Sequence, residues 1–138
     1  MTDTPKAAYC GPRIPELLAP AGSFEKMATA IHYGADAVYL GGKAFSLRAR
    51  AANFDEEGLR QAVHYAHEQR VKVYVTVNIF AHNHDLECLE SYLLMLQDAG
   101  TDGLIVSDPG ILAMARRIVP DLSLHLSTQA NVTNAWSP

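Results

Sequence analysis

Apolar and polar positions follow a repeated strand–helix pattern that begins near residue 16. Short apolar runs rich in β-branched residues predict strands, and the clearest is VKVYVTVNIF at 71–80. Between such runs, apolar residues recur with helical spacing, as at Phe24, Met27 and Ile31, which would share one helix face. The pattern predicts five strands, at 16–20, 35–42, 71–80, 102–108 and 122–128, and four helices, at 23–34, 55–70, 86–100 and 109–119.

Alternating strands and helices predict an α/β fold with a parallel sheet and right-handed crossovers. Periodicity alone does not separate an open sheet from part of a closed barrel. The first strand–helix turn, APAGSF at 19–24, lacks the GxGxxG pattern, and no GxxxxGK[ST] motif occurs, which favours a barrel. We expect a flexible tail at 1–14 and one continuous unit over 15–138.

Local signals support these boundaries. Ser23, Asp55 and Asp108 stand where helix N-caps are expected, and Pro109 suits the first helical position. Two segments also repeat a pattern of helix-ending Gly, Asp and apolar strand: YGADAVYLGG at 33–42 and AGTDGLIVSD at 99–108. They lie two strand–helix units apart.

Composition argues against several classes of protein, including strongly basic, disulfide-rich and membrane-spanning ones. The 138 residues carry a formal net charge of −4, so any basic nucleic-acid face would have to be a local patch. Cys10 and Cys88 form no CxxC motif, which argues against a thiolate metal site or a disulfide framework from this chain. No apolar run reaches the ~18 residues of a membrane-spanning helix, and the start has no signal-peptide core. We expect a cytoplasmic protein with no membrane partner.

Parallel α/β folds bind ligands at the carboxyl ends of their strands. The predicted strand ends carry small or polar side chains, which could line one wet pocket. The substrate-binding candidates are Tyr39, Asn78, Asp108, Ser127, Gln129 and Asn131 at the strand ends, and Arg48 and Arg50 in the basic loop that also holds Lys43.

Structural interpretations stand beside these functional ones. Asp108 is expected first as a helix cap, which does not exclude ligand contact. Asn78 fits a buried hydrogen-bond network as well as a substrate contact. Arg48 and Arg50 fit either a solvated loop or a clamp for carboxylates or phosphates, because guanidinium offers a planar fork of donors.

The histidines give no clear catalytic pattern. His82 and His84, in HNHD, lie two residues apart without a third ligand at helical spacing, so a solvated loop or helix cap is expected rather than zinc. His125 fits either a barrel interior or a satisfied core hydrogen bond. It also stands two residues from Ser127, a poor spacing for a nucleophile–base pair, and we predict no serine hydrolase.

Five segments resemble, in order and spacing, the N-terminal region of a known family. They are PELLAPAG, YGADAVYLGG, VNIFAHN, VSDPG and HLSTQAN, and they span roughly 15–134. The family is that of the bacterial collagenase-like peptidases, the thirty-second family of peptidases of unknown catalytic type. Any one of the segments has little specificity, whereas five in register make a specific match.

The resemblance implies a TIM-type (β/α) barrel, of which 15–138 would be the N-terminal half, ending before a sixth strand. A family signature of Glu, Phe, Gly and cysteines would lie downstream, and further cysteines in several members bind an iron–sulfur cluster. Cys10 and Cys88 match neither set. We therefore expect no cofactor within this part, an iron–sulfur cluster only from downstream cysteines, and no activity from this part alone.

The family resemblance also implies two kinds of activity. Some members carry the name of proteases, and others resemble oxygen-independent hydroxylation enzymes of tRNA or rRNA bases, with prephenate implicated, or of ubiquinone precursors. The RNA-directed members are the most similar, on the segments SLRARAANF at 46–54, SDPG at 107–110 and HLSTQAN at 125–131. The expected substrate is thus a peptide or protein, or a tRNA or rRNA. The alternative is a non-catalytic half-barrel that associates through its exposed edges.

Overall fold

The computed structural model describes residues 14–46, 53–134 and 136 of the chain. The predicted N-terminal tail falls outside these residues except for Ile14, which is almost fully exposed. Arg48 and Arg50 also lie outside them.

Five parallel strands form one sheet, as the sequence predicts. Each strand pairs with the next along the chain, in the order β1-β2-β3-β4-β5, and every pair is parallel. The strands are β1 (Leu18–Pro20), β2 (Ala37–Gly41), β3 (Lys72–Val77), β4 (Gly103–Val106) and β5 (Ser123–Leu126). Strands that follow one another in this way, each after a helix, are the pattern of a (β/α) barrel segment.

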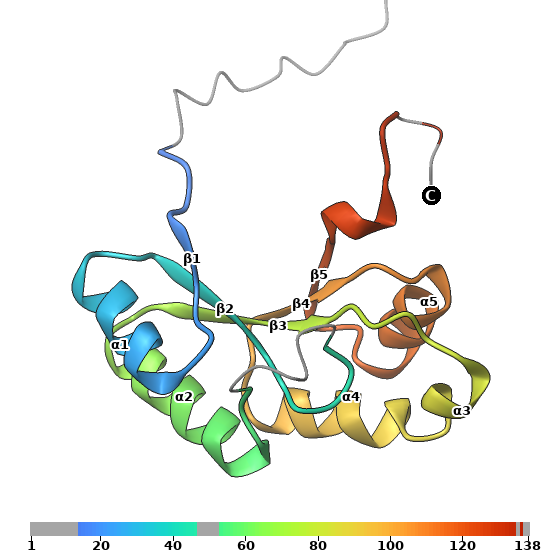
Figure 1. The fold of residues 1–138 in the computed structure, drawn as a ribbon, viewed down its shortest axis with the longest axis horizontal. Coiled ribbons are helices and arrows are strands. Elements are labelled where there is room, and N and C mark those ends of the chain that lie inside the picture. Colours follow the sequence, from blue (N-terminus) through green and yellow to red (C-terminus); the bar gives the residue numbers. More distant parts are fainter. Residues whose placement is uncertain (1–13, 47–52, 135, 137–138) are drawn as a thin grey trace, which may run out of the picture.

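Helices connect the strands and gather on one side of the sheet. Figure 1 shows α2, α4 and α5 along that side, while the segment after β5 rises on the other. The helices of the described residues are α1 (Phe24–His32), α2 (Glu56–Glu68), α3 (Asn83–Leu86), α4 (Leu89–Asp98) and α5 (Pro109–Ile118), with a 3₁₀ turn η1 (Thr128–Ala130) after β5.

The predicted caps are confirmed. Ser23 Oγ accepts from the Lys26 N–H at 3.3 Å, and Asp55 Oδ1 accepts from the Gly58 N–H at 2.9 Å. One predicted helix, 86–100, is wrong in its extent, because Leu86 ends the short helix α3 and α4 begins only at Leu89. The Asp85 carboxylate accepts the His82 N–H at 2.8 Å and starts a separate turn before Leu89.

The hydrophobic core lies between the sheet and the helices. Alternate strand residues face the helices, and the register aligns them in rows, as in Leu40, Val75 and Leu104. These side chains are buried together with the inner stripe of α4, Leu89, Leu93 and Leu96. Burying one such side chain contributes about 1.5–3 kcal/mol, so this layer fixes the sheet on its helices.

The opposite face of the sheet has no helix over it in the described part of the chain (Figure 1). Its rows include Tyr39 beside Tyr74, and Thr76 beside Ile105 and His125. We call this the uncovered face. In a closed (β/α) barrel, side chains of this face fill the barrel interior.

The internal repeat has a structural basis. Gly34 and Gly100 each end a helix with positive φ, at 92° and 81°, a conformation that favours glycine. The aspartate that follows then binds the backbone of the preceding strand: Asp36 accepts the Leu17 N–H at 2.8 Å, and Asp102 accepts the Val73 N–H at 2.7 Å. The repeat therefore aligns β2 on β1 and β4 on β3.

Candidate functional site

The carboxyl edge of the sheet brings two predicted residues into direct contact. Asn78, just after β3, donates from Nδ2 to the Gln129 Oε1 at 3.0 Å, although the two residues lie 51 positions apart in the sequence. Asn78 is half-buried and Gln129 is exposed. Each amide has two N–H groups and a carbonyl oxygen, so this pair places both hydrogen-bond donors and acceptors at the edge.

Ser127 and Asn131 build the turn that brings Gln129 to Asn78. The Ser127 N–H donates to the Val106 carbonyl at 2.7 Å, which extends the β5 pairing by one step. Its Oγ accepts the Gln129 N–H at 3.3 Å. Asn131 closes η1 in the left-handed region, with φ 53°, a conformation that asparagine tolerates. Both residues thus support the amide pair through the backbone.

Asp108 acts as the N-cap of α5. Its Oδ1 accepts the Ile111 N–H at 2.9 Å, and Pro109 occupies the first turn, as the sequence predicts. The carboxylate is half-buried at the end of β4. It therefore lies at the predicted edge of the sheet, with at least one oxygen committed to the helix.

Tyr39 does not belong to the same group. It pairs in register with Pro20 and Tyr74 on the uncovered face, within β2 rather than at its end. The register places Asn78 four residues further along β3, or about 13 Å at strand rise. Sequence position near a strand end therefore did not distinguish Tyr39, within β2, from Asn78 and Gln129 at the carboxyl edge.

The basic loop is described only at its two ends. Gly42 and Phe54 form a parallel bridge, with the Lys43 N–H on the Phe54 carbonyl at 3.0 Å. The Lys43 ammonium pairs with Asp55 at 3.0 Å, and both side chains are largely exposed. Lys43 therefore pairs with the N-cap residue of α2. The anion clamp assigned to Arg48 and Arg50 stays a prediction.

Sequence reasoning missed a hydroxyl pair at this edge. Ser46 is only 4% exposed, and its Oγ lies 3.2 Å from the Thr76 Oγ1. Thr76 Oγ1 in turn donates to the Leu40 carbonyl at 3.2 Å. The consecutive glycines Gly41 and Gly42 at a strand end were the available signal, because glycine there marks a close approach of other atoms.

A buried phenol lies beneath the same loop. The Tyr92 hydroxyl is buried without a hydrogen-bond partner in the described residues, and a Cβ on Gly42 would collide with it. The Tyr92 ring packs on Phe45 with centroids 4.9 Å apart. Burial raises the pKa of the Tyr92 hydroxyl well above its ordinary value, so the group stays protonated.

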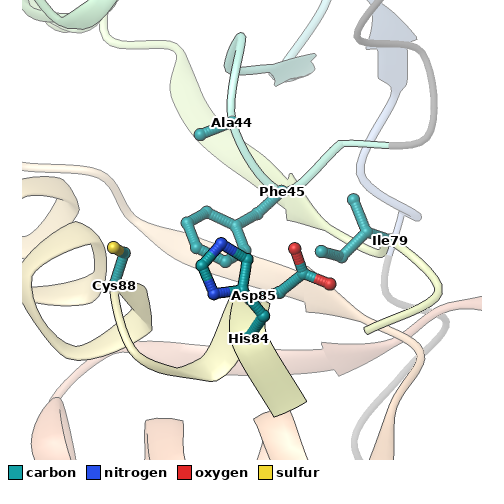
Figure 2. A pocket seen from close by; sticks show the side chains of 6 residues that line it. All are labelled: Ala44, Phe45, Ile79, His84, Asp85 and Cys88. Atoms are coloured by element: carbon teal, nitrogen blue, oxygen red, sulfur yellow. The ribbon is translucent and has the colours of Figure 1, made fainter. Parts of the chain in front are cut away.

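A shallow groove of about 310 Å³ lies beside the loop (Figure 2). Its apolar side consists of Ala44, Phe45 and Ile79, and its polar side of His84, Asp85 and Cys88. Figure 2 shows the Cys88 sulfur turned away from the His84 ring, so the groove does not present a thiol–imidazole pair.

The HNHD segment starts the short helix α3, in line with the predicted helix cap. The His82 backbone N–H is bound by Asp85, and the His84 ring lies 3.6 Å from the Glu87 carboxylate. Within the ranges that the structure describes, no three His, Cys, Asp or Glu side chains are gathered to hold a metal ion.

Charged groups cluster instead at the amino ends of the strands. The Glu16 carboxylate accepts from Lys72 Nζ and from the Tyr74 hydroxyl, each at 2.8 Å. His125, exposed on the uncovered face, packs on the Tyr74 ring with centroids 4.7 Å apart. The structure thus places His125 on the face that becomes a barrel interior, the first of the two predicted surroundings.

These contacts shift the pKa values of the cluster. The hydrogen bonds from Lys72 and then Tyr74 lower the pKa of Glu16, and the same bond from Glu16 raises the pKa of Lys72. Burial, followed by the hydrogen bond to Glu16, raises the pKa of Tyr74. The cluster therefore stays an ion pair with a neutral phenol near neutral pH.

Solved structures with similar folds support the barrel assignment. The U32 peptidase Mk0906 matches 91% of this chain and 56% of that chain, with a TM-score of 0.63 and 17% identity. The YdjI aldolase of Escherichia coli K12, which has a TIM-barrel-like fold, matches 80% of this chain and 43% of that chain, with a TM-score of 0.56. At such identities the likeness concerns the fold: the chain forms about half of such a barrel.

Curated relatives are much closer in sequence. The chain is 50% identical over 120 residues to tRNA hydroxylation protein P1 of Bacillus subtilis, covering 87% of this chain and 28% of that protein. It is 44% identical over 123 residues to tRNA hydroxylation protein P of Escherichia coli K12, covering 89% and 27%. A collagenase of Porphyromonas gingivalis is 37% identical over 121 residues, covering 87% and 29%. The chain thus spans under a third of the length of these relatives.

In the described part of the chain, no helix combines the length and apolar character needed to cross a membrane. The sequence model of peptidase family U32 matches residues 22–137, which is most of the chain. The resemblance carried by the five sequence segments is thereby confirmed, and the chain belongs to peptidase family U32.

Proposed function

We propose that this chain is the N-terminal, substrate-facing part of an enzyme that hydroxylates a base of tRNA. The relatives at 50% and 44% identity are named tRNA hydroxylation proteins. The structural observation that carries the proposal is the Asn78–Gln129 amide pair at the carboxyl edge, where parallel α/β folds bind ligands. The chain's share of the relatives' length leaves room for the remaining catalytic parts elsewhere in the protein.

The chemistry of the edge suits a nucleobase. Proteins that recognise single-stranded RNA hydrogen-bond the edges of unstacked bases, and amide side chains supply both donors and acceptors for this. Asn78 and Gln129 would contact the base, while Ser127 and Asn131 hold the turn that carries Gln129. Asp108, at the end of β4, would orient the substrate from the start of α5.

The co-substrate assigned from the family resemblance is prephenate. It is an anionic dicarboxylate, and the planar donors of arginine suit carboxylates. We assign Arg48 and Arg50 to this anion, on the sequence alone. An iron–sulfur cluster would have to be held by cysteines outside this chain, and no reaction step is assigned to it.

Peptide hydrolysis is less well supported by the geometry. Ser127 Oγ accepts a backbone N–H, and His125 packs on Tyr74 on the uncovered face. Cys88 is exposed and turned away from His84 (Figure 2). Neither Ser127 nor Cys88 therefore has one of these histidines beside it as the base that a nucleophile in covalent acyl transfer uses.

The test is nucleoside mass spectrometry of total tRNA from source cells with and without the gene. Loss of a nucleoside one oxygen atom heavier than its parent is expected on deletion, with recovery by the wild-type gene. Asn78→Ala and Gln129→Ala should fail to restore it, whereas Gln61→Ala, an exposed amide on α2, should restore it fully. Unchanged tRNA in the deletion strain would contradict the proposal.

The alternative function is a half-barrel that assembles with a second half-barrel. It is favoured by the exposure of Leu18 and Leu126, which are 41% and 40% exposed on the two outermost strands of the sheet. Analytical ultracentrifugation of the chain separates the two ideas when combined with the tRNA result. A stable dimer together with unchanged tRNA would favour assembly over catalysis.

A further inference from the structure

The hydroxyl pair at the carboxyl edge has a defined direction. Thr76 has one hydroxyl proton, which it donates to the Leu40 carbonyl at 3.2 Å. The Ser46 hydroxyl, 3.2 Å from Thr76 Oγ1, is therefore the donor to Thr76. This relay, Ser46 to Thr76 to Leu40, ties the segment after β2 onto the ends of β2 and β3.

The space for the relay exists because residue 41 is glycine. A Cβ on Gly41 would lie 2.5 Å from Ser46 Oγ and 3.2 Å from Thr76 Oγ1. Real Cβ atoms do not approach other atoms as closely as 2.5 Å. Ser46 is also 4% exposed, so water does not replace its partner easily.

The neighbouring residue connects the relay to the amide pair. The Phe45 carbonyl accepts the N–H of Asn78 at 2.9 Å and the N–H of Ile79 at 3.2 Å. Phe45 has φ 58°, a left-handed conformation that is unusual for a bulky side chain and requires support from its surroundings. Ser46 is the adjacent residue and is anchored through its hydroxyl, so it supplies part of that support.

We propose that Ser46 and Thr76 are positioning residues that fix Asn78 for substrate through the Phe45 carbonyl. The Asn78 backbone is held by Phe45, and its side chain then reaches Gln129. Without the relay, Phe45 can leave the left-handed region, and the two N–H groups lose their acceptor. The substrate-binding part of this inference rests on the proposed tRNA hydroxylation, whereas the backbone part does not.

The matched control is another threonine of the same chain. Thr101 Oγ1 donates to the Leu96 carbonyl at 3.0 Å, and Thr101 is 4% exposed, but it lies before β4 at the amino edge. Thr76→Val and Thr101→Val each remove one threonine–carbonyl hydrogen bond at opposite edges. Thr76→Ser keeps the hydroxyl, and Ser46→Ala tests the other end of the relay with the loss of a single oxygen.

The first readout is hydrogen exchange of the Asn78 and Ile79 backbone N–H groups by NMR in the purified protein. Exchange should accelerate by about tenfold in Thr76→Val and Ser46→Ala, as expected for local opening, and stay near wild type in Thr101→Val and Thr76→Ser. Unchanged exchange in both relay variants, or equal acceleration in Thr101→Val, would overturn the proposal.

The second readout is the kinetics of tRNA hydroxylation by the full-length protein. An increase in KM or a decrease in kcat of about tenfold is expected for Thr76→Val, with recovery in Thr76→Ser. Thr101→Val should change thermal stability but neither constant. If the wild-type protein does not hydroxylate tRNA, the proposed function fails, and the exchange measurement still decides whether Ser46 and Thr76 hold Asn78.

Discussion

The two edges of the sheet are built from different chemistry. At the amino edge, carboxylates take part in the main contacts: Glu16 binds Lys72 and Tyr74, and Asp102 binds the Val73 N–H and the His67 ring, the latter at 2.9 Å. At the carboxyl edge, neutral amides and hydroxyls predominate, as in the Asn78–Gln129 pair.

We infer from this difference that the amino edge mainly stabilises the fold, whereas the carboxyl edge mainly binds ligand. A charged hydrogen bond to a backbone N–H is stronger than a neutral one, and losing it leaves buried groups without partners. Neutral amides exchange partners at lower cost, which suits a surface that must accept a ligand. The comparison therefore predicts that amino-edge variants lower stability, whereas carboxyl-edge variants lower activity more than stability.

The largest effect on stability is expected at Asp102. Asp102→Ala removes the acceptor of the Val73 N–H and should lower the free energy of unfolding by about 2–3 kcal/mol, as measured by urea denaturation. Asp98→Ala is the control, because it breaks an exposed ion pair with Arg60 and should have no measurable effect. Equal effects of the two substitutions would break the comparison of the edges.

Gly41→Ala should have the next largest effect. The added methyl would collide with Ser46 Oγ, and overpacking of this kind costs about 1–3 kcal/mol. Gly22→Ala provides the control, because a Cβ there meets nothing within 4 Å. Differential scanning calorimetry should show a lower Tm for Gly41→Ala alone, and a wild-type Tm would mean that the Ser46 hydroxyl moves freely.

A smaller effect, on activity alone, is expected from the paired replacement of Arg48 and Arg50 by Ala. If both hold an anionic co-substrate, the full-length enzyme should lose roughly tenfold in kcat/KM, the size expected from one charged hydrogen bond. Stability should stay at the wild-type value. Full activity at limiting co-substrate would remove the clamp and leave these arginines as solvated loop residues.

The smallest effect is a pH dependence at Glu16. Hydrogen bonds from Lys72 and Tyr74 lower its pKa in the folded protein, so the folded state binds fewer protons than the unfolded state. The resulting stability is present above the ordinary glutamate pKa of about 4.3 and is lost as pH falls through the lower folded value. The difference in unfolding free energy between wild type and Glu16→Gln should therefore shrink below that pH, and a constant difference would argue against the ion pair.

The sequence predicted the fold well because its signals are local. Apolar alternation located all five strands, and Ser23, Asp55 and Asp108 located helix starts. The break between α3 and α4 was missed, because the leucine spacing runs on through it. The hydrogen bond from the His82 N–H to the Asp85 side chain starts α3, and hydrophobic periodicity gives no signal of such a bond.

The candidate site was only partly predictable. Strand-end position correctly grouped Asn78 with Gln129, because carboxyl ends of parallel strands share one edge. The same criterion also included Tyr39, although the strand register places Tyr39 beside Tyr74 and within β2. Ser46 was missed because its role depends on the space left by Gly41, a contact that emerges only when β2 pairs with β3.

The Gly–Asp repeat has a consequence for how such a chain can be recombined. Asp36 joins β2 to β1, and Asp102 joins β4 to β3, so these two aspartates tie the strands in pairs, beside the Thr76 contact that joins β3 to β2. A cut or duplication between β2 and β3 leaves both aspartate ties intact. One between β3 and β4 separates Asp102 from the Val73 N–H that it binds. Gene fusions that change this protein in steps of two strand–helix modules should therefore keep both Gly–Asp ties, whereas those in steps of one should lose a tie.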